Sequence, residues 1–320
     1  MDIITLTSKE KSNKKRIEKR SYFAIMLSIL GCVLLMISQV VLSFLFAPVF
    51  NADIDRTTEI IFEMIIYVSS FVVAFGFIGC LFKTFFKNNS PYVAKRYLPQ
   101  NPVLYIIGTI GICYLCNLIV QTLFQNFVKD YSVDPNIAID TPLSIILYYV
   151  YIALLPAIFE ELAFRHVILT NLLPYGKWGA IICSSLLFGI VHIDPPRIIF
   201  ATVFGIMLAI CREHTGSLIV PMIIHFINNA ISVTVSIAGQ TTVGTVIFGN
   251  LIYSFMIVGI VAVFFYFKNG LNSKKISLIA PISHGYKLSA TQYISKLLLN
   301  VGMIPLAFVY CFFFYLYFLA

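Results

Sequence analysis

Charged residues are scarce in this chain. Only 11% of its 320 residues are Asp, Glu, Lys or Arg, against about 25% in ordinary soluble domains, and 59% are hydrophobic. No stretch combines enough charge and turn chemistry to cover a water-facing surface, so a soluble fold is excluded. We therefore expect one polytopic membrane domain of the all-α class.

Three further features are missing. The seven cysteines lie mostly inside apolar runs, where Cys acts as a small hydrophobe, and they do not indicate a disulfide framework. There is no internal repeat, which weakens the case for an inverted-repeat transporter. No RNA- or DNA-binding motif accompanies the net charge of +8, so nucleic acid is not an expected partner.

Long apolar runs are abundant. A helix needs about 20 mostly apolar residues to cross ~30 Å of hydrocarbon. By this criterion we predict nine spans, with eight as the alternative. The fifth and sixth runs are short and form either two spans or a re-entrant pair. The runs are Tyr22–Phe46, Ile60–Phe86, Val103–Phe127, Pro142–Leu173, Trp178–Ile193, Ile198–Cys211, Leu218–Ala238, Val246–Phe267 and Ile294–Leu319.

The distribution of Lys and Arg predicts the orientation, because these residues accumulate on the cytoplasmic side of short loops. With nine spans and a cytoplasmic N-terminus, 18 of the 22 Lys and Arg lie in inner segments and only three lie in outer ones. A basic face toward anionic membrane lipid then explains the net charge. We expect a multi-pass cell-membrane protein, and its Ile-, Lys- and Asn-rich composition is compatible with a bacterial origin.

Polar side chains inside the expected spans are the candidate functional residues. An ionisable residue in a bilayer costs roughly 2.5–3.5 kcal/mol on insertion scales and is functional by default. Such residues, together with two amides, gather in the fourth, fifth and seventh spans. They are Glu160, Glu161, Arg165, His166, His192, His225, Asn228 and Asn229.

The spacing in the fourth span separates its two acids. At about 100° per residue, Glu161 and Arg165 lie on one helix face and can neutralise each other. Glu160 lies about 140° away from Arg165 and is left to work with another helix. Pro156 lacks a backbone donor and is expected to kink this span beside the acidic pair.

The seventh span presents a second polar pair, because His225 and Asn229 are four residues apart on one face. A rise of ~1.5 Å per residue puts Glu160, His192 and Asn229 about 18–22 Å from the inner boundary, and His225 about 12 Å from it. A Glu and a His facing a His and an Asn supply a base for water and donors for an oxyanion. These groups are what acyl hydrolysis by water requires.

At these residues the sequence resembles the CPBP family of CAAX-processing and bacteriocin-processing intramembrane proteases, also called Abi or type II CAAX prenyl endopeptidase-like proteins. The signatures of this family are EExxxR, FxxxH and HxxxN. They appear here in order, as EELAFR at 160–165, FGIVH at 188–192 and HFINN at 225–229. Each motif is weak alone, but three in order, each in an expected span, are a strong combined signal.

The resemblance implies a glutamic intramembrane endopeptidase with no cofactor. Glu160 with His192 would activate the water, while His225 and Asn229 would form the oxyanion site. Three residues would support these four. They are Glu161 and Arg165, which would orient and stabilise their helix, and Phe188, which would pack beside the site.

Relatives in eukaryotes and some archaea process prenylated CAAX proteins. Bacterial members are associated with peptide processing, bacteriocin self-immunity or envelope functions. The implied partners are membrane lipid and a membrane-associated or lipidated protein or peptide substrate. The sequence indicates neither the cleavage position nor the oligomeric state.

Two other functions stay open at this point. A zinc peptidase is one, because Glu160, His192 and His225 offer three ligands and leave a position for water, although an HExxH motif is missing. A non-catalytic membrane scaffold or regulatory protein is the other. In that case the acids form a buried ion network, and the polar residues of the seventh span hold helices together.

The expected organisation has four parts. Residues 1–21 form a basic cytoplasmic tail, and 22–268 form the transmembrane protease domain, with its family core at about 142–238. A cytoplasmic linker follows at 269–293, and 294–320 form a last transmembrane helix.

Overall fold

The computed structural model describes residues 8–52, 54–86, 102–124, 141–238, 241–273 and 287–318. Every regular element in these ranges is a helix, which confirms the all-α prediction. Parts of four expected segments lie outside the described residues, namely 1–7 of the tail, 125–127 of the third span, 274–286 of the linker and 319–320 of the last helix.

Among the described residues, seven helical segments are long and apolar enough to cross a membrane, and one bent pair makes an eighth if it is a single span. The count is below the nine spans predicted and equals the alternative of eight only if the bent pair is one span; it supports a multi-pass membrane protein. The seven are α1 (Ser8–Phe50), the run of α2 (Arg56–Phe71), η1 (Val72–Gly76) and α3 (Phe77–Phe85), α4 (Pro102–Phe124), the segment Pro142–Tyr175, α9 (Pro195–Thr215), α10 (Ile219–Ala238) and α11 (Thr242–Ser273).

The expected fifth span is a short helix, α8 (Lys177–Ile190), whose 14 residues rise only about 21 Å. α8 and α9 form a hairpin whose two ends meet, because Lys177 and Glu213 line the same pocket. His192 lies in the turn between these helices and not inside a span. The fifth and sixth runs therefore form a helical hairpin that starts and ends on one side of the bundle.

The last apolar run, expected as one helix, is broken. It forms α12 (Ala290–Leu298) and α13 (Met303–Phe318), which are bent by 65°. Polar groups satisfy the backbone at the break: the Asn300 side chain donates to the Tyr22 carbonyl and accepts from the Gly302 N–H, while the Tyr22 hydroxyl accepts from the Val301 N–H. Helix ends need such partners, which explains why the chain can turn here.

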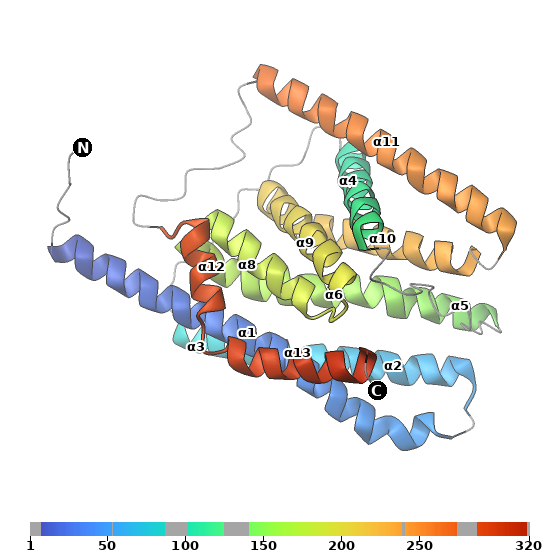
Figure 1. Cartoon of the computed structure of the whole chain (residues 1–320), viewed down its shortest axis with the longest axis horizontal. Helices are drawn as coiled ribbons and strands as arrows, with labels where there is room; N and C mark the ends of the chain where they lie inside the picture. The colour runs from blue at the N-terminus through green and yellow to red at the C-terminus, as the bar shows by residue number, and fades with distance from the viewer. Residues whose placement is uncertain are drawn as a thin grey trace.

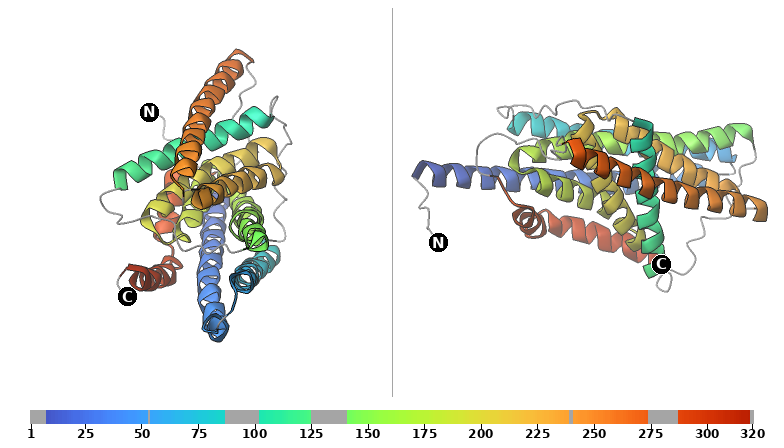
Figure 2. Two further views of the ribbon diagram at one scale, coloured as in Figure 1. Left: turned by 90° about the vertical axis from the view of Figure 1, so that its right-hand side faces the viewer. Right: turned by 90° about the horizontal axis from the view of Figure 1, so that it is seen from above.

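The helices form three layers (Figure 1). The middle layer contains α5 (Pro142–Tyr149) to α10. On one side of it lie α4 and α11, and on the other side lie α1 to α3 with α12 and α13. Figure 2 shows that α4 crosses the long axis of the bundle steeply. The polar residues of the three motifs all lie in the middle layer.

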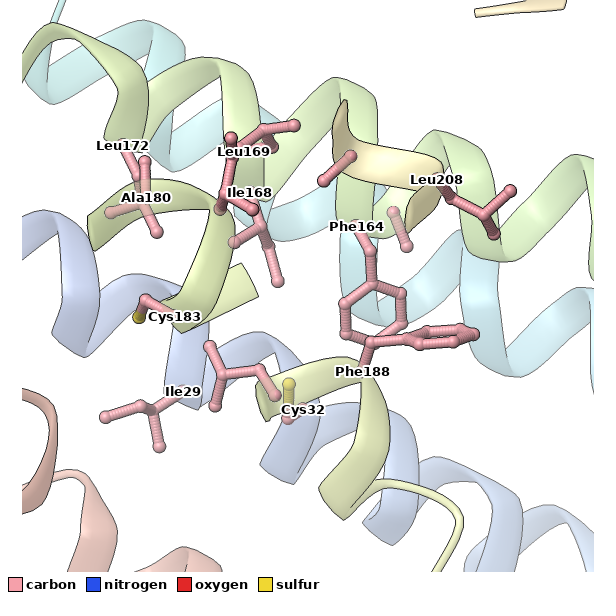
Figure 3. Packing of buried hydrophobic residues seen from close by; sticks show 14 of the residues in the cluster. Ile29, Cys32, Phe164, Ile168, Leu169, Leu172, Ala180, Cys183, Phe188 and Leu208 are labelled. Carbon is pink, nitrogen blue, oxygen red and sulfur yellow. The ribbon is translucent and has the colours of Figure 1, made fainter. Parts of the chain in front are cut away.

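The apolar core is centred where α1 meets the middle layer. Phe164 and Phe188 pack edge to face with ring centroids 5.1 Å apart, and Cys32 of α1 lies nearby (Figure 3). α12 is tied to the same core: the ring of Tyr293 occupies the space beside Gly179, where a Cβ would come within 2.1 Å of it. The last two helices are therefore packed parts of the bundle and not a loose appendage.

Candidate active site

The fourth span, on which the candidate site is built, is an irregular helix. It consists of α5, η2 (Val150–Leu154), α6 (Leu155–Glu160), η3 (Glu161–Leu169), α7 (Thr170–Leu172) and η4 (Leu173–Tyr175). Both η2 and η3 are π-helical, a wide turn that is rare and occurs frequently at functional sites. Glu160 ends α6 and Glu161 begins η3, so the two acids lie where the helix changes its winding.

Pro156 is where the sequence predicts an irregularity, and η2 directly precedes it. A proline has no N–H for the carbonyl four residues earlier, which here belongs to Ile152. Asn229 of α10 donates its Nδ2 to this carbonyl at 3.2 Å. A neighbouring helix thus supplies a donor that the proline removed, as membrane helices commonly require.

Glu161 and Arg165 form the expected ion pair. Both are buried, at 0% and 1% exposure, and Arg165 Nη1 lies 3.1 Å from Glu161 Oε1. The guanidinium also donates to the Gly205 carbonyl at 3.2 Å and lies 4.4 Å from the centre of the Phe188 ring. Arg165 therefore joins η3 to both helices of the α8–α9 hairpin.

His225 joins the two acids. Its Nδ1 lies 3.0 Å from Glu161 Oε1, and its Nε2 lies 3.7 Å from Glu160 Oε2. An ionised carboxylate only accepts hydrogen bonds, so we assign the proton of the shorter contact to Nδ1. The rings of Phe188 and Phe204 pack edge to face with the imidazole, with centroid distances of 6.1 and 5.3 Å. The Nε2 atom is thereby directed at Glu160.

Glu160 has a partner that the motifs do not contain. Tyr67 of α2 donates its hydroxyl to Glu160 Oε1 at 2.9 Å, so the two carboxylate oxygens face different helices. The Tyr67 ring is held by Phe71 and Tyr151, with centroids at 4.8 and 6.2 Å. Sequence reasoning missed Tyr67, because a single tyrosine in an apolar run carries no spacing signal.

His192 reaches the cluster through Phe188. Its Nδ1 lies 2.8 Å from the Phe188 carbonyl oxygen, and the two rings meet edge to face at 5.0 Å. The next residue, Ile193, has a φ of 65°, and it is the one non-glycine residue with positive φ among those the structure describes.

Comparison with known proteins gives one match. Residues 142–231 match the family described as Rce1-like, type II CAAX prenyl endopeptidase Rce1-like. This segment, less than a third of the chain, is similar to that family and is called the CAAX-protease-like segment below. None of the curated proteins and none of the solved structures matches the chain. The resemblance stated from the three motifs is thereby confirmed for the segment that contains them.

Within the CAAX-protease-like segment, the predicted site residues fall into two groups. Glu160, Glu161, Arg165 and His225 form one connected polar cluster, called the Glu–His cluster below, with Phe188 against it. His192 stands beside this cluster across Phe188, while Asn229 is bonded to the Ile152 carbonyl and to Asn228. The catalytic roles of all these residues stay predictions.

In the part of the chain that the structure describes, no three His, Cys, Asp or Glu side chains gather as a ligand set for a metal ion. Two of the three residues offered for zinc, Glu160 and His225, do lie together, with His192 as their neighbour across Phe188. A chelator experiment distinguishes zinc from a metal-free mechanism and is described below.

Proposed function

We propose that this protein is an intramembrane endopeptidase in which Glu160 activates a water to hydrolyse a peptide bond. The observation that supports this most is the position of His225 between Glu160 and Glu161, inside the segment that is similar to CAAX proteases. Two acids that share one imidazole in a water-poor interior are an expensive way to pack helices. A site that transfers protons needs such a buried arrangement, which explains why the chain carries it.

The carboxylate of Glu160 has one oxygen bonded to Tyr67 and the other directed at His225. A contact of 3.7 Å is longer than a hydrogen bond and suits a water that bonds to both groups. In the proposed reaction Glu160 takes a proton from this water, and the hydroxide attacks the carbonyl carbon of the substrate. His192 helps to hold the water.

The attack produces a tetrahedral intermediate with a negative oxygen. We assign its stabilisation to the imidazole of His225, which Glu161 holds in place through Nδ1, and to the second N–H of the Asn229 amide. The carbon–nitrogen bond then breaks, and Glu160 returns its proton to the leaving nitrogen. Arg165 balances the charge of Glu161 and does not touch the substrate.

The substrate we propose is a peptide or protein that is itself in the membrane or anchored there by a lipid. The cluster lies in the middle layer of a bundle whose helices are long and apolar enough to cross a membrane, so a substrate held in the membrane shares its environment. CAAX-type processing, peptide maturation and bacteriocin self-immunity all use substrates of this kind. The active site chemistry is the same for the three.

Comparative peptidomics tests this function and identifies the substrate. Membranes from cells that carry wild-type protein, Glu160→Gln or Glu59→Gln are analysed by mass spectrometry for new chain ends. Glu59 is the matched control, a partly exposed acid at the start of α2 that pairs with Arg56. We expect products in the wild type and in Glu59→Gln, and none in Glu160→Gln. Products that persist in Glu160→Gln contradict the proposal.

The scaffold alternative is separated by the same approach in a complementation assay. If Glu160→Ala and His192→Ala both restore a deletion strain fully, the protein acts without catalysis. The zinc alternative is separated by assaying purified protein after treatment with strong chelators. Full activity in the metal-free protein supports the glutamate mechanism, and loss that zinc restores supports the metal.

A further inference from the structure

The turn that carries His192 is strained. Asp194 donates its N–H to the His192 carbonyl at 2.7 Å, which closes a three-residue γ-turn with Ile193 at its centre. With φ at 65°, Ile193 adopts the rare form of this turn, and a β-branched residue is the least suited to it. Such a backbone persists only where its surroundings hold it in place.

A residue far away in the sequence holds it here. The hydroxyl of Tyr310, on α13, donates to the Ile193 carbonyl at 2.7 Å. α13 is itself fixed: the Asn300 side chain and the Val301 N–H, just before it, bond to Tyr22 of α1, and Leu306 is 1% exposed. The tyrosine therefore reaches the turn from a rigid support.

This γ-turn also determines where the His192 imidazole lies. His192 is bonded through Nδ1 to the Phe188 carbonyl of α8, and its own carbonyl is part of the γ-turn. Relaxation of Ile193 into the helical or extended region breaks the bond from Asp194 and rotates the peptide that follows His192. The backbone that supports the bond between the His192 side chain and the Phe188 carbonyl is then no longer fixed.

We propose that Tyr310 is a positioning residue for His192, acting from a helix that lies outside the CAAX-protease-like segment. The inference rests on the proposed function for its effect on catalysis, but the effect on the turn is independent of it. Tyr310 does not touch the substrate. Its hydroxyl stabilises the strained backbone that presents His192, which gives α13 a role beyond anchoring in lipid.

A double-mutant cycle tests this with Tyr310→Phe and Ile193→Gly. Glycine adopts positive φ without strain, so the turn no longer needs the hydroxyl. We expect Tyr310→Phe to lower kcat about five- to tenfold with KM changed less than about twofold, as for the loss of one hydrogen bond. In the Ile193→Gly background the same change should cost less than about twofold. Tyr315→Phe, an exposed tyrosine on the same helix, is the matched control and should change nothing.

A second readout does not need activity. The rates at which diethyl pyrocarbonate modifies His192 and His225 are followed by mass spectrometry in the same four proteins and the control. Tyr310→Phe should speed the modification of His192 several-fold and leave His225 unchanged. If Tyr310→Phe behaves like Tyr315→Phe in this readout, or if its effect is equally large in the Ile193→Gly background, the inference is wrong. If the wild type cleaves nothing while His192 responds as expected, the proposed function fails and the positioning of the turn stands.

Discussion

Two regions reach the candidate site, and they do so with different chemistry. The Glu–His cluster in the middle layer consists of side chains that carry charge, and Glu161 and Arg165 are fully buried. The outer helices α2 and α13 contribute neutral hydroxyls: Tyr67 bonds to Glu160, and Tyr310 bonds to the Ile193 carbonyl beside His192. Buried charges must be paired, because removing one partner leaves the other charge unpaired in the interior and destabilises the fold strongly. Neutral hydroxyls adjust geometry at a lower cost. Substitutions in the Glu–His cluster should therefore cause large losses of activity or stability, whereas substitutions of Tyr67 or Tyr310 should reduce activity only in part.

The largest effect is expected for Glu160→Gln. The amide keeps the size of the carboxylate but cannot take a proton, so activity should fall by about a thousandfold, within the usual range for a general base. The melting temperature in detergent should remain close to that of the wild type. The measurement is initial cleavage rate on a substrate peptide, with Glu59→Gln assayed beside it. Activity in Glu160→Gln within about tenfold of wild type would remove Glu160 from the mechanism.

Arg165→Met should act through stability. It leaves Glu161 as a buried charge whose remaining partner is His225, and a loss of roughly 3–5 kcal/mol in the free energy of unfolding is expected. Unfolding in detergent, followed by fluorescence, measures this. Arg16→Met, at an exposed position of α1, is the control. The pair Glu161→Gln with Arg165→Met should recover part of the loss, and a double variant less stable than Arg165→Met would contradict the pairing.

Asn229→Ala should show two separable effects. We expect activity to fall about a hundredfold, as for the loss of an oxyanion donor, and stability to fall because the Ile152 carbonyl loses its donor. Pro156→Ala restores a backbone N–H four residues after Ile152. In that background the stability loss should shrink while the activity loss persists. If both losses disappear together, Asn229 acts only as the hydrogen-bond donor for the Ile152 carbonyl.

Tyr67→Phe is expected to have the smallest effect among these variants. It removes one hydrogen bond to a charged oxygen, and about a tenfold decrease in kcat/KM follows from the usual strength of such bonds. Stability should not change measurably, since the ring keeps its contacts with Phe71 and Tyr151. Tyr253→Phe, exposed on α11, serves as the control. A loss of about a thousandfold in Tyr67→Phe would mean that an outer residue acts as part of the Glu–His cluster.

The sequence predicts what happens within one helix better than what happens between helices. The Glu161–Arg165 pair follows from spacing along one span and is present. The π-helical turn η2 lies just before Pro156, where a kink is expected. The contact of Glu161 with His225 joins two spans, and the spacing within the fourth span pairs Glu161 only with Arg165. Hydropathy predicts nine spans where the described residues contain seven or eight candidates, and one difference is α8, whose 14 residues are few for a span.

The contacts that the sequence does not predict are those made by single residues from distant helices. Tyr67 and Tyr310 lie in apolar runs with many other aromatic residues, and only packing selects which of them meets Glu160 or Ile193. The break between α12 and α13 is similar, since Asn300 becomes informative only once its bond to Tyr22 is seen. Long-range contacts of this kind depend on how the helices are arranged, which periodicity does not contain.

The most direct test of the central claim is hydrolysis in water enriched in oxygen-18. Purified wild type and Glu160→Gln are placed in lipid nanodiscs with a peptide found by peptidomics, and the products are weighed by mass spectrometry. We predict one oxygen-18 atom at the new carboxyl terminus in the wild type and no product in the variant. Product formed by Glu160→Gln at the wild-type rate, or product without the label, contradicts the claim that Glu160 activates a water to cleave a peptide bond.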